Sequence, residues 1–186
     1  MEKDLNKLRD RAYKCACEHG FHDKVYSDAH FLMLVITEIS EAVEADRKGK
    51  RANINDFLMI NQRSINRTKN ENYLNGIAFE SCIKDSVEDE LSDVVIRLLD
   101  FAGLKKVELN RIILAYVVSP KKSFTENMYA IVKDVVNYKY STEELVNYAI
   151  HQVIRVADFL KINIFQHIEW KMKYNESRPM LNGKNY

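Results

Sequence analysis

The sequence predicts an all-α protein, a helical bundle of five or six helices that residues 1–186 form as a single domain. Apolar residues recur at three- and four-residue steps along much of the chain, which is the period of an amphipathic helix. Five Gly and two Pro in the whole chain are too few for a turn-rich β fold. The length of 186 residues is enough to bury one substantial core.

Two helices are expected in the first fifty residues. The first covers residues 2–19. The second begins after a cap at Ser27, runs to about Lys48 and ends at Gly49. Its segment 31–36 is apolar on all sides, so we expect this helix to be the central and most buried one of the bundle.

Residues 51–82 interrupt the helical pattern. Asn is frequent in this segment, and Lys and Arg are scattered between the Asn residues. We expect an inserted loop with room for short helical turns. A connection of this length is typical of a lid or a binding loop, and disorder is the alternative.

The next helix, residues 83–103, is the element around which the rest of the chain is organised. Its apolar residues follow helical spacing, and Gly103 supplies the stop. The members of this apolar stripe are Val87, Leu91, Val94, Val95, Leu98 and Ala102.

Residues 104–119 are ambiguous, because the β-branched run within them fits either a strand or a buried helical turn. Two capping boxes follow, each opening a helical pattern, and a last helix covers about Ile164 to Asn175. We expect residues 176–186 to form an extended polar tail. The capping boxes are Ser123 with Glu126 and Ser141 with Glu144.

Two pairs of acids flank the apolar stripes of two different helices. Glu38 and Glu41 form one pair, and Glu90 and Asp93 form the other. Residues three apart project from one face of a helix, so two such helices can close four carboxylates around a cation. Either pair alone would more often be a solvated face, but two pairs beside apolar stripes favour a site.

The acids predict a hard cation as the ligand of this site. Neither pair includes a histidine or a thiolate, so the donor set selects Mg²⁺, with Mn²⁺ as a possible substitute. The absence of a Glu-x-x-His motif argues against a di-iron bundle. Because Mg²⁺ usually shares its coordination shell with substrate phosphates, we expect a polyphosphate substrate.

Basic and amide side chains could hold such a substrate. Arg97 lies one turn after Asp93, although an ion pair within the helix is equally compatible with its position. Lys171, Asn175 and Arg178 would share a face if the last helix continued through them, and they suit a phosphate chain and a base or sugar. An ordinary solvated terminus is the alternative.

Charge and composition limit the partners and the location. With 28 basic and 27 acidic residues, the net charge of +1 gives no electrostatic case for nucleic acid. The apolar run at residues 31–36 is too short to span a bilayer, and the charged N-terminus does not resemble a signal peptide. Three cysteines without a CxxC motif predict a reducing, cytoplasmic location.

These motifs resemble a known family. Glu38-x-x-Glu41 followed by Glu90-x-x-Asp93, together with the tail from His167 to Tyr186, is similar to the MazG-like nucleoside triphosphate pyrophosphohydrolases of the all-α NTP pyrophosphatase superfamily. The resemblance covers residues 29–49, 83–103 and 160–186. The gap between the two acidic motifs, residues 42–89, is longer than the family usually shows, so the resemblance leaves the identity of the nucleotide open.

The resemblance implies hydrolysis of a dNTP or a non-standard NTP between its α- and β-phosphates, with Mg²⁺ on the four carboxylates. It also implies a homodimer or a homotetramer. Glu38 or Glu41 would orient the attacking water as general base. Two alternatives stay open: a non-catalytic helical partner-binding module, and a phosphohydrolase that acts on another nucleotide such as a dinucleotide or an alarmone.

Overall fold

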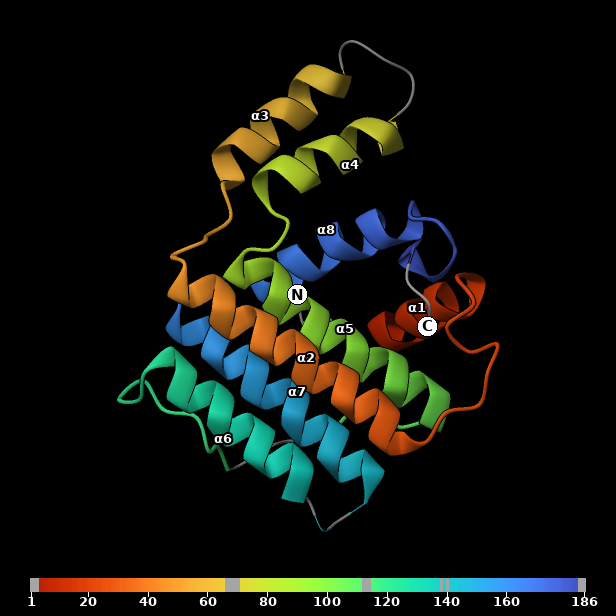
Figure 1. The fold of residues 1–186 in the computed structure, drawn as a ribbon, viewed down its shortest axis with the longest axis vertical. Coiled ribbons are helices and arrows are strands. Elements are labelled where there is room, and N and C mark those ends of the chain that lie inside the picture. The colour runs from red at the N-terminus through yellow and green to blue at the C-terminus, as the bar shows by residue number, and fades with distance from the viewer. Residues whose placement is uncertain (1–3, 66–70, 112–114, 138, 140, 184–186) are drawn as a thin grey trace.

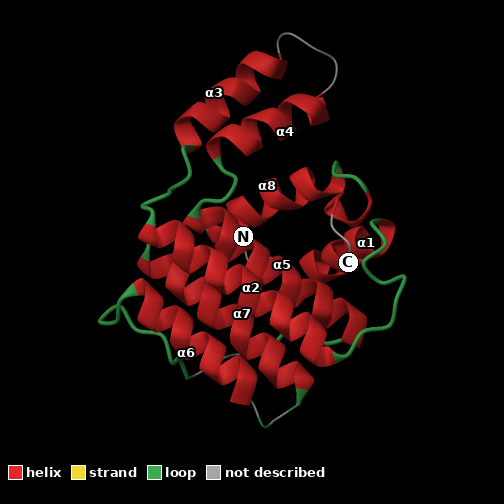
Figure 2. Ribbon diagram, viewed as in Figure 1, coloured by secondary structure: helices red, strands yellow, loops and turns green. Residues whose placement is uncertain are grey.

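The computed structural model describes residues 4–65, 71–111, 115–137, 139 and 141–183. These residues contain eight α-helices, one short 3₁₀ helix and no strand, which confirms the all-α class (Figure 2). The predicted count of five or six helices is too low. None of the helices in this part of the chain combines the length and the apolar character that a membrane crossing needs.

The elements follow one another along the chain as Figure 1 shows. They are α1 (Leu5–Glu18), α2 (Asp28–Arg47), α3 (Ile54–Ile65), α4 (Glu71–Cys82), α5 (Val87–Lys105), α6 (Phe124–Asn137), α7 (Thr142–Phe159), α8 (Ile164–Glu176) and the 3₁₀ helix η1 (Met180–Gly183).

Helix α5 is the centre of the bundle. It packs against α1, α2, α7 and α8, and thirteen of its 19 residues are buried. The expectation that the second helix would be the most buried one is wrong. One face of α2 is open to solvent, where Met33 is 56% exposed, so the apolar segment 31–36 is only partly covered.

Helix α5 begins and ends at residues other than those predicted. The Ser86 hydroxyl accepts a hydrogen bond from the Asp89 amide (3.2 Å), so the helix begins at Val87. It passes through Gly103 and ends at Lys105, and the C-cap residue Lys106 has φ of 56°. Gly103 has a different role: a Cβ atom at this position would lie 2.4 Å from Cβ of Tyr13. The absent side chain therefore lets α1 approach α5 closely.

The predicted inserted loop is a helical hairpin, formed by α3 and α4, that extends from one end of the bundle (Figure 1). The Asn53 side chain accepts from the Asp56 amide (3.1 Å) and so caps the first turn of α3. The hairpin has its own small core, which contacts α8 through aromatic rings. Phe57 packs on Trp170 (4.7 Å between ring centroids), and Phe79 stacks on Tyr174 (4.5 Å).

The ambiguous segment after α5 has no regular secondary structure in residues 107–111 and 115–119, and residues 112–114 lie outside the described part. Buried side-chain amides of α7 form hydrogen bonds with this segment, as a partner strand would. Asn147 donates to the Glu108 carbonyl (2.8 Å), and Gln152 accepts from the Val117 amide (3.1 Å). These bonds satisfy backbone groups that a helix or a sheet would otherwise pair.

In the C-terminal half of the chain, the structure agrees better with what the local sequence signals predict. Both predicted capping boxes form, with the Ser123 and Ser141 hydroxyls accepting from the backbone three residues later. The predicted last helix is α8. The tail is not extended: it forms η1 and returns to α1, where the Leu181 amide donates to the His19 carbonyl (2.8 Å). Residues 184–186 of the predicted tail lie outside the described part.

Candidate metal centre and its pocket

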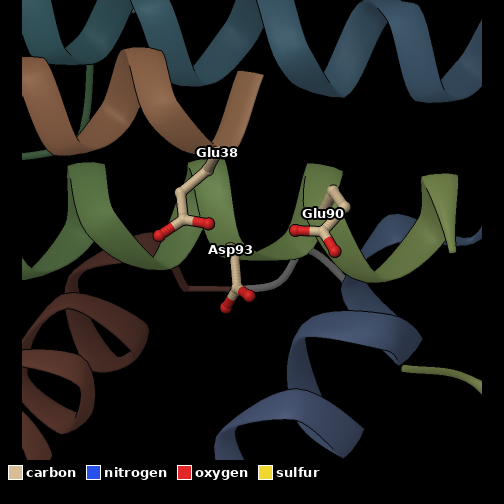
Figure 3. A group of neighbouring side chains, drawn as sticks. All are labelled: Glu38, Glu90 and Asp93. Carbon is tan, nitrogen blue, oxygen red and sulfur yellow. The ribbon is translucent and has the colours of Figure 1, made fainter. Parts of the chain in front are cut away.

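Three of the four predicted acids meet between α2 and α5. Glu38 descends from α2, while Glu90 and Asp93 project from one face of α5 (Figure 3). One carboxylate oxygen from each lies within 4.8 Å of those from the other two. Glu38 and Glu90 are buried, and Asp93 is half-buried. The close packing of α2 on α5 therefore brings together residues that are 52 positions apart in the chain.

Glu41, the fourth predicted acid, lies apart from this group. It is exposed, one turn after Glu38 on α2. It still lines the same pocket as the other three acids.

Two of the predicted substrate-binding residues form ion pairs with these acids. The Lys171 ammonium on α8 is buried and lies 2.6 Å from Oδ2 of Asp93 and 2.7 Å from Oδ1 of Asp89. The Arg97 guanidinium donates to Oε1 of Glu38 (3.0 Å), which lies on the neighbouring helix. Arg97 thus pairs across the helix interface with α2.

Asp89 is a buried member of the site that the sequence analysis missed. Besides its bond to Lys171, it accepts from the Asp85 backbone amide (2.9 Å). It lies one turn before Asp93 on the same face of α5, and that spacing was the available signal. Asp85, Asp89 and Glu90 make a second group of three acids, so Glu90 belongs to both groups.

The clustered charges shift the pKa values of these residues. Burial, assisted by the negative charges of Asp89 and Asp93, raises the pKa of Glu90 to about 9. Burial also raises the pKa of Asp89 to about 6, against the opposing effect of the Lys171 ammonium. Burial and then the charge of Asp93 raise the pKa of Glu38. Without a cation, the Glu90 carboxyl is therefore neutral near pH 7.

For Lys171, in contrast, the surroundings stabilise the charged form of the side chain. Its burial alone would lower its pKa, but the carboxylates of Asp93 and Asp89 outweigh burial and raise the pKa above the ordinary value. Lys171 is therefore a permanent positive charge inside the acid group.

The residues present fit a hard divalent cation. All donors are carboxylate oxygens, which Mg²⁺ and Mn²⁺ prefer. Oxygens that share one Mg²⁺ at about 2.1 Å lie at most about 4.2 Å apart, so the acid group needs only a small contraction around the ion. Ligation by Glu90 also requires the loss of its proton.

A pocket of about 190 Å³ contains these acids and extends along α5. The remaining predicted substrate residues, Asn175 and Arg178, line it too. The Arg178 guanidinium lies over the Tyr174 ring, 5.6 Å from its centroid. Among the described residues, none from α3 or α4 lines this pocket.

The pocket therefore joins an acid group suited to a cation with basic side chains suited to phosphate oxygens. No known family model, curated protein or solved structure matches this chain.

Proposed function

We propose that this protein is a Mg²⁺-dependent nucleoside triphosphate pyrophosphohydrolase, which converts a dNTP or a non-standard NTP into the monophosphate and pyrophosphate. The main support is the convergence of Glu38, Glu90 and Asp93 in one pocket that Lys171 and Arg97 also line. The resemblance of the two acidic motifs and the tail to MazG-like enzymes supports the same reaction.

In this proposal, three carboxylates are metal ligands and a fourth is the general base. Glu38, Glu90 and Asp93 would hold Mg²⁺, which would supply charge neutralisation for the triphosphate and acidify a bound water. Glu38 accepts from Arg97, whereas Glu41 is exposed in the pocket wall. Glu41 is therefore the better placed acid to take a proton from the attacking water.

The basic residues hold the phosphates. With Asp93 as a ligand of the cation, the Lys171 ammonium that now pairs with Asp93 would be available to a phosphate oxygen. Arg97 and Arg178 line the same pocket and add guanidinium donors suited to a polyphosphate. Asn175 of α8 lines the same pocket.

A nucleotide panel with Mg²⁺ tests this proposal. We expect pyrophosphate and the monophosphate as products, and no release of orthophosphate. Glu38→Gln and Asp93→Asn should each lower kcat by at least about a hundredfold, because a ligand to the cation is lost. Glu44→Gln is the matched control on α2, because Glu44 forms exposed ion pairs with Arg47 and Lys48. Orthophosphate as the product, or cleavage of dinucleotides in place of triphosphates, would contradict the proposal.

The second candidate is a non-catalytic helical partner-binding module. The observation in its favour is that Lys171 and Arg97 already neutralise Asp93 and Glu38, as they would in a purely structural ion network. Calorimetric titration with Mg²⁺ separates the two candidates. Site-specific binding that Asp93→Asn removes supports the enzyme, and the lack of such binding supports the module.

Assembly and location complete the proposal. We propose a homodimer or a homotetramer, and the exposed Met33 on α2 with Tyr129 and Val136 on α6 provides apolar surface for contact between copies. Light scattering over a range of concentrations tests this. The cysteines are free, which supports the proposed cytoplasmic location.

A further inference from the structure

The pocket continues along α5 beyond the acid group. Asp93 and Asp100 both line it and are seven residues apart on this helix. At 1.5 Å per residue, this places Asp100 about 10 Å from Asp93 along the helix axis. A nucleotide whose phosphates lie at the acid group would therefore place its nucleoside end toward Asp100.

Asp100 is a buried carboxylate with a fixed orientation. His22 Nε2 donates to its Oδ1 (2.7 Å), and both side chains are about nine-tenths buried. The His22 ring is itself held between Phe31 (5.6 Å between centroids) and Tyr13 (5.0 Å). His22 thus supports Asp100 from behind, and the second oxygen of Asp100 can accept a further hydrogen bond.

Asn175 adds an unpaired polar atom to the same pocket. It lies one turn after Lys171 on α8, and its Oδ1 is buried without a hydrogen-bond partner among the described residues. A buried polar atom without a partner costs about 1–3 kcal/mol, so a donor from a ligand would relieve that cost. An amide can turn to offer either end, whereas the Asp100 carboxylate can only accept.

We infer that this end of the pocket selects a nucleobase that carries an exocyclic amino group, with Asp100 as the acceptor for that group and Asn175 as a second contact. Cytosine and adenine present an amino donor on the edge where uracil and thymine present a carbonyl oxygen. Two oxygens cannot share a hydrogen bond without a proton, so uracil and thymine would bring a carbonyl oxygen against Asp100 and could pair with it only in a shifted pose that presents their ring N–H. Phe21 also lines the pocket; the Arg97 guanidinium lies over its ring, 5.7 Å from the centroid, so a base would stack on the other ring face.

This inference rests on the proposed function and names the substrate class for it. Pairs of nucleotides that differ only at the amino position provide the test: dCTP against dUTP, and dATP against dITP. In the wild-type protein with Mg²⁺, we expect kcat/KM for pyrophosphate release to be at least about tenfold higher for the amino member of a pair, the size of one charged hydrogen bond.

The outcomes of this panel are distinct. Equal or faster turnover of dUTP and dITP overturns the inference and leaves the proposed function standing. The lack of pyrophosphate from every nucleotide overturns both. The wild-type panel needs no variant, so it is independent of any folding defect.

The variant Asp100→Asn then tests the residue. We expect the ratio of kcat/KM between dCTP and dUTP to fall to within about threefold of one, because the amide can donate to the carbonyl oxygen of uracil. A loss of equal size for both nucleotides would mean that Asp100 contacts the sugar or only anchors the loop through His22, and would overturn its assignment. Asp28→Asn is the matched control: Asp28 pairs with Lys105 near the same end of α5 and should leave the ratio unchanged.

Discussion

At the residue scale, Lys171 is the side chain on which the acid group most depends. Its ammonium is buried between Asp89 and Asp93, and removal of one partner from a buried ion pair typically costs about 3–5 kcal/mol. We therefore expect Lys171→Met to lower the free energy of unfolding by that amount in urea titrations without Mg²⁺. Lys173→Met, at an exposed position on the same helix, should change it by less than about 0.5 kcal/mol. Equal stability of the two variants would contradict the buried pairing.

A substitution at Glu90 should lower activity without lowering stability. Because its carboxyl is neutral near pH 7 without a cation, Gln is a close substitute there, and Glu90→Gln should be as stable as the wild type or more stable. The same change removes a proposed ligand to Mg²⁺, so turnover should fall by at least about a hundredfold. Thermal unfolding at pH 7 and pyrophosphate release, measured on one preparation, test both halves. A variant with wild-type turnover at saturating Mg²⁺ would remove Glu90 from the site.

At the element scale, the contact of α1 with α5 depends on the missing side chain of Gly103. Gly103→Ala should destabilise the protein by about 1–3 kcal/mol, since its Cβ would overlap Tyr13. Gly76→Ala in α4 is the control, because a Cβ there meets nothing within 4 Å. It should stabilise the protein by up to about 1 kcal/mol through helix propensity. Urea midpoints of the two variants should move in opposite directions; movement in the same direction would refute the packing role of Gly103.

The α3–α4 hairpin should open independently of the bundle. Its small core contains Phe79, which stacks on Tyr174 of α8. Phe79→Ala should weaken this core by about 3–5 kcal/mol. Hydrogen exchange should then accelerate across α3 and α4 while the amides of α7 keep their protection. Uniform acceleration in all helices would show instead that the hairpin and the bundle unfold together.

The elements that the sequence predicted well have strong local signals. Helices α6 and α7 follow from serine caps whose hydrogen bonds need only neighbouring residues. The hairpin was missed because Asn lowers helix propensity, while the aromatic contacts that stabilise it come from α8, far along the chain. Gly103 was mistaken for a stop because its reason lies in Tyr13 on another helix.

At the scale of the whole molecule, stability without a cation should fall as the pH rises. The folded protein keeps the Glu90 proton up to about pH 9, whereas the unfolded chain releases it near the ordinary value of 4.5. The stabilisation is therefore complete below about pH 4.5 and is lost toward pH 9, by at most about 1.4 kcal/mol per pH unit. Asp89 acts in the same direction between its ordinary value and about 6.

Urea midpoints at several pH values, with EDTA or with excess Mg²⁺, measure this dependence. We expect a downward slope in EDTA that Mg²⁺ flattens, since the ion binds the carboxylate form. Glu90→Gln should flatten the slope without Mg²⁺. A stability that rises with pH in EDTA would show that Glu90 is ionised in the folded protein.

The candidate site was only partly visible in the sequence. Helical spacing places Glu90 and Asp93 on one face of α5, and Glu38 on the face of α2 that meets it. Helical spacing cannot show which residues from other helices form ion pairs with those acids. The pairing of Lys171 with Asp89, and that of His22 with Asp100, depend on tertiary packing.

The buried ammonium of Lys171 has one more consequence. With its own counter-charge already in place between Asp89 and Asp93, the chain reaches its folded shape before any ion arrives. In the proposed metal site, loading would then be an exchange between a tethered cation and a mobile one, separate in time from folding. A newly made chain would mature where free Mg²⁺ is scarce, and chelation would return it to a folded resting form.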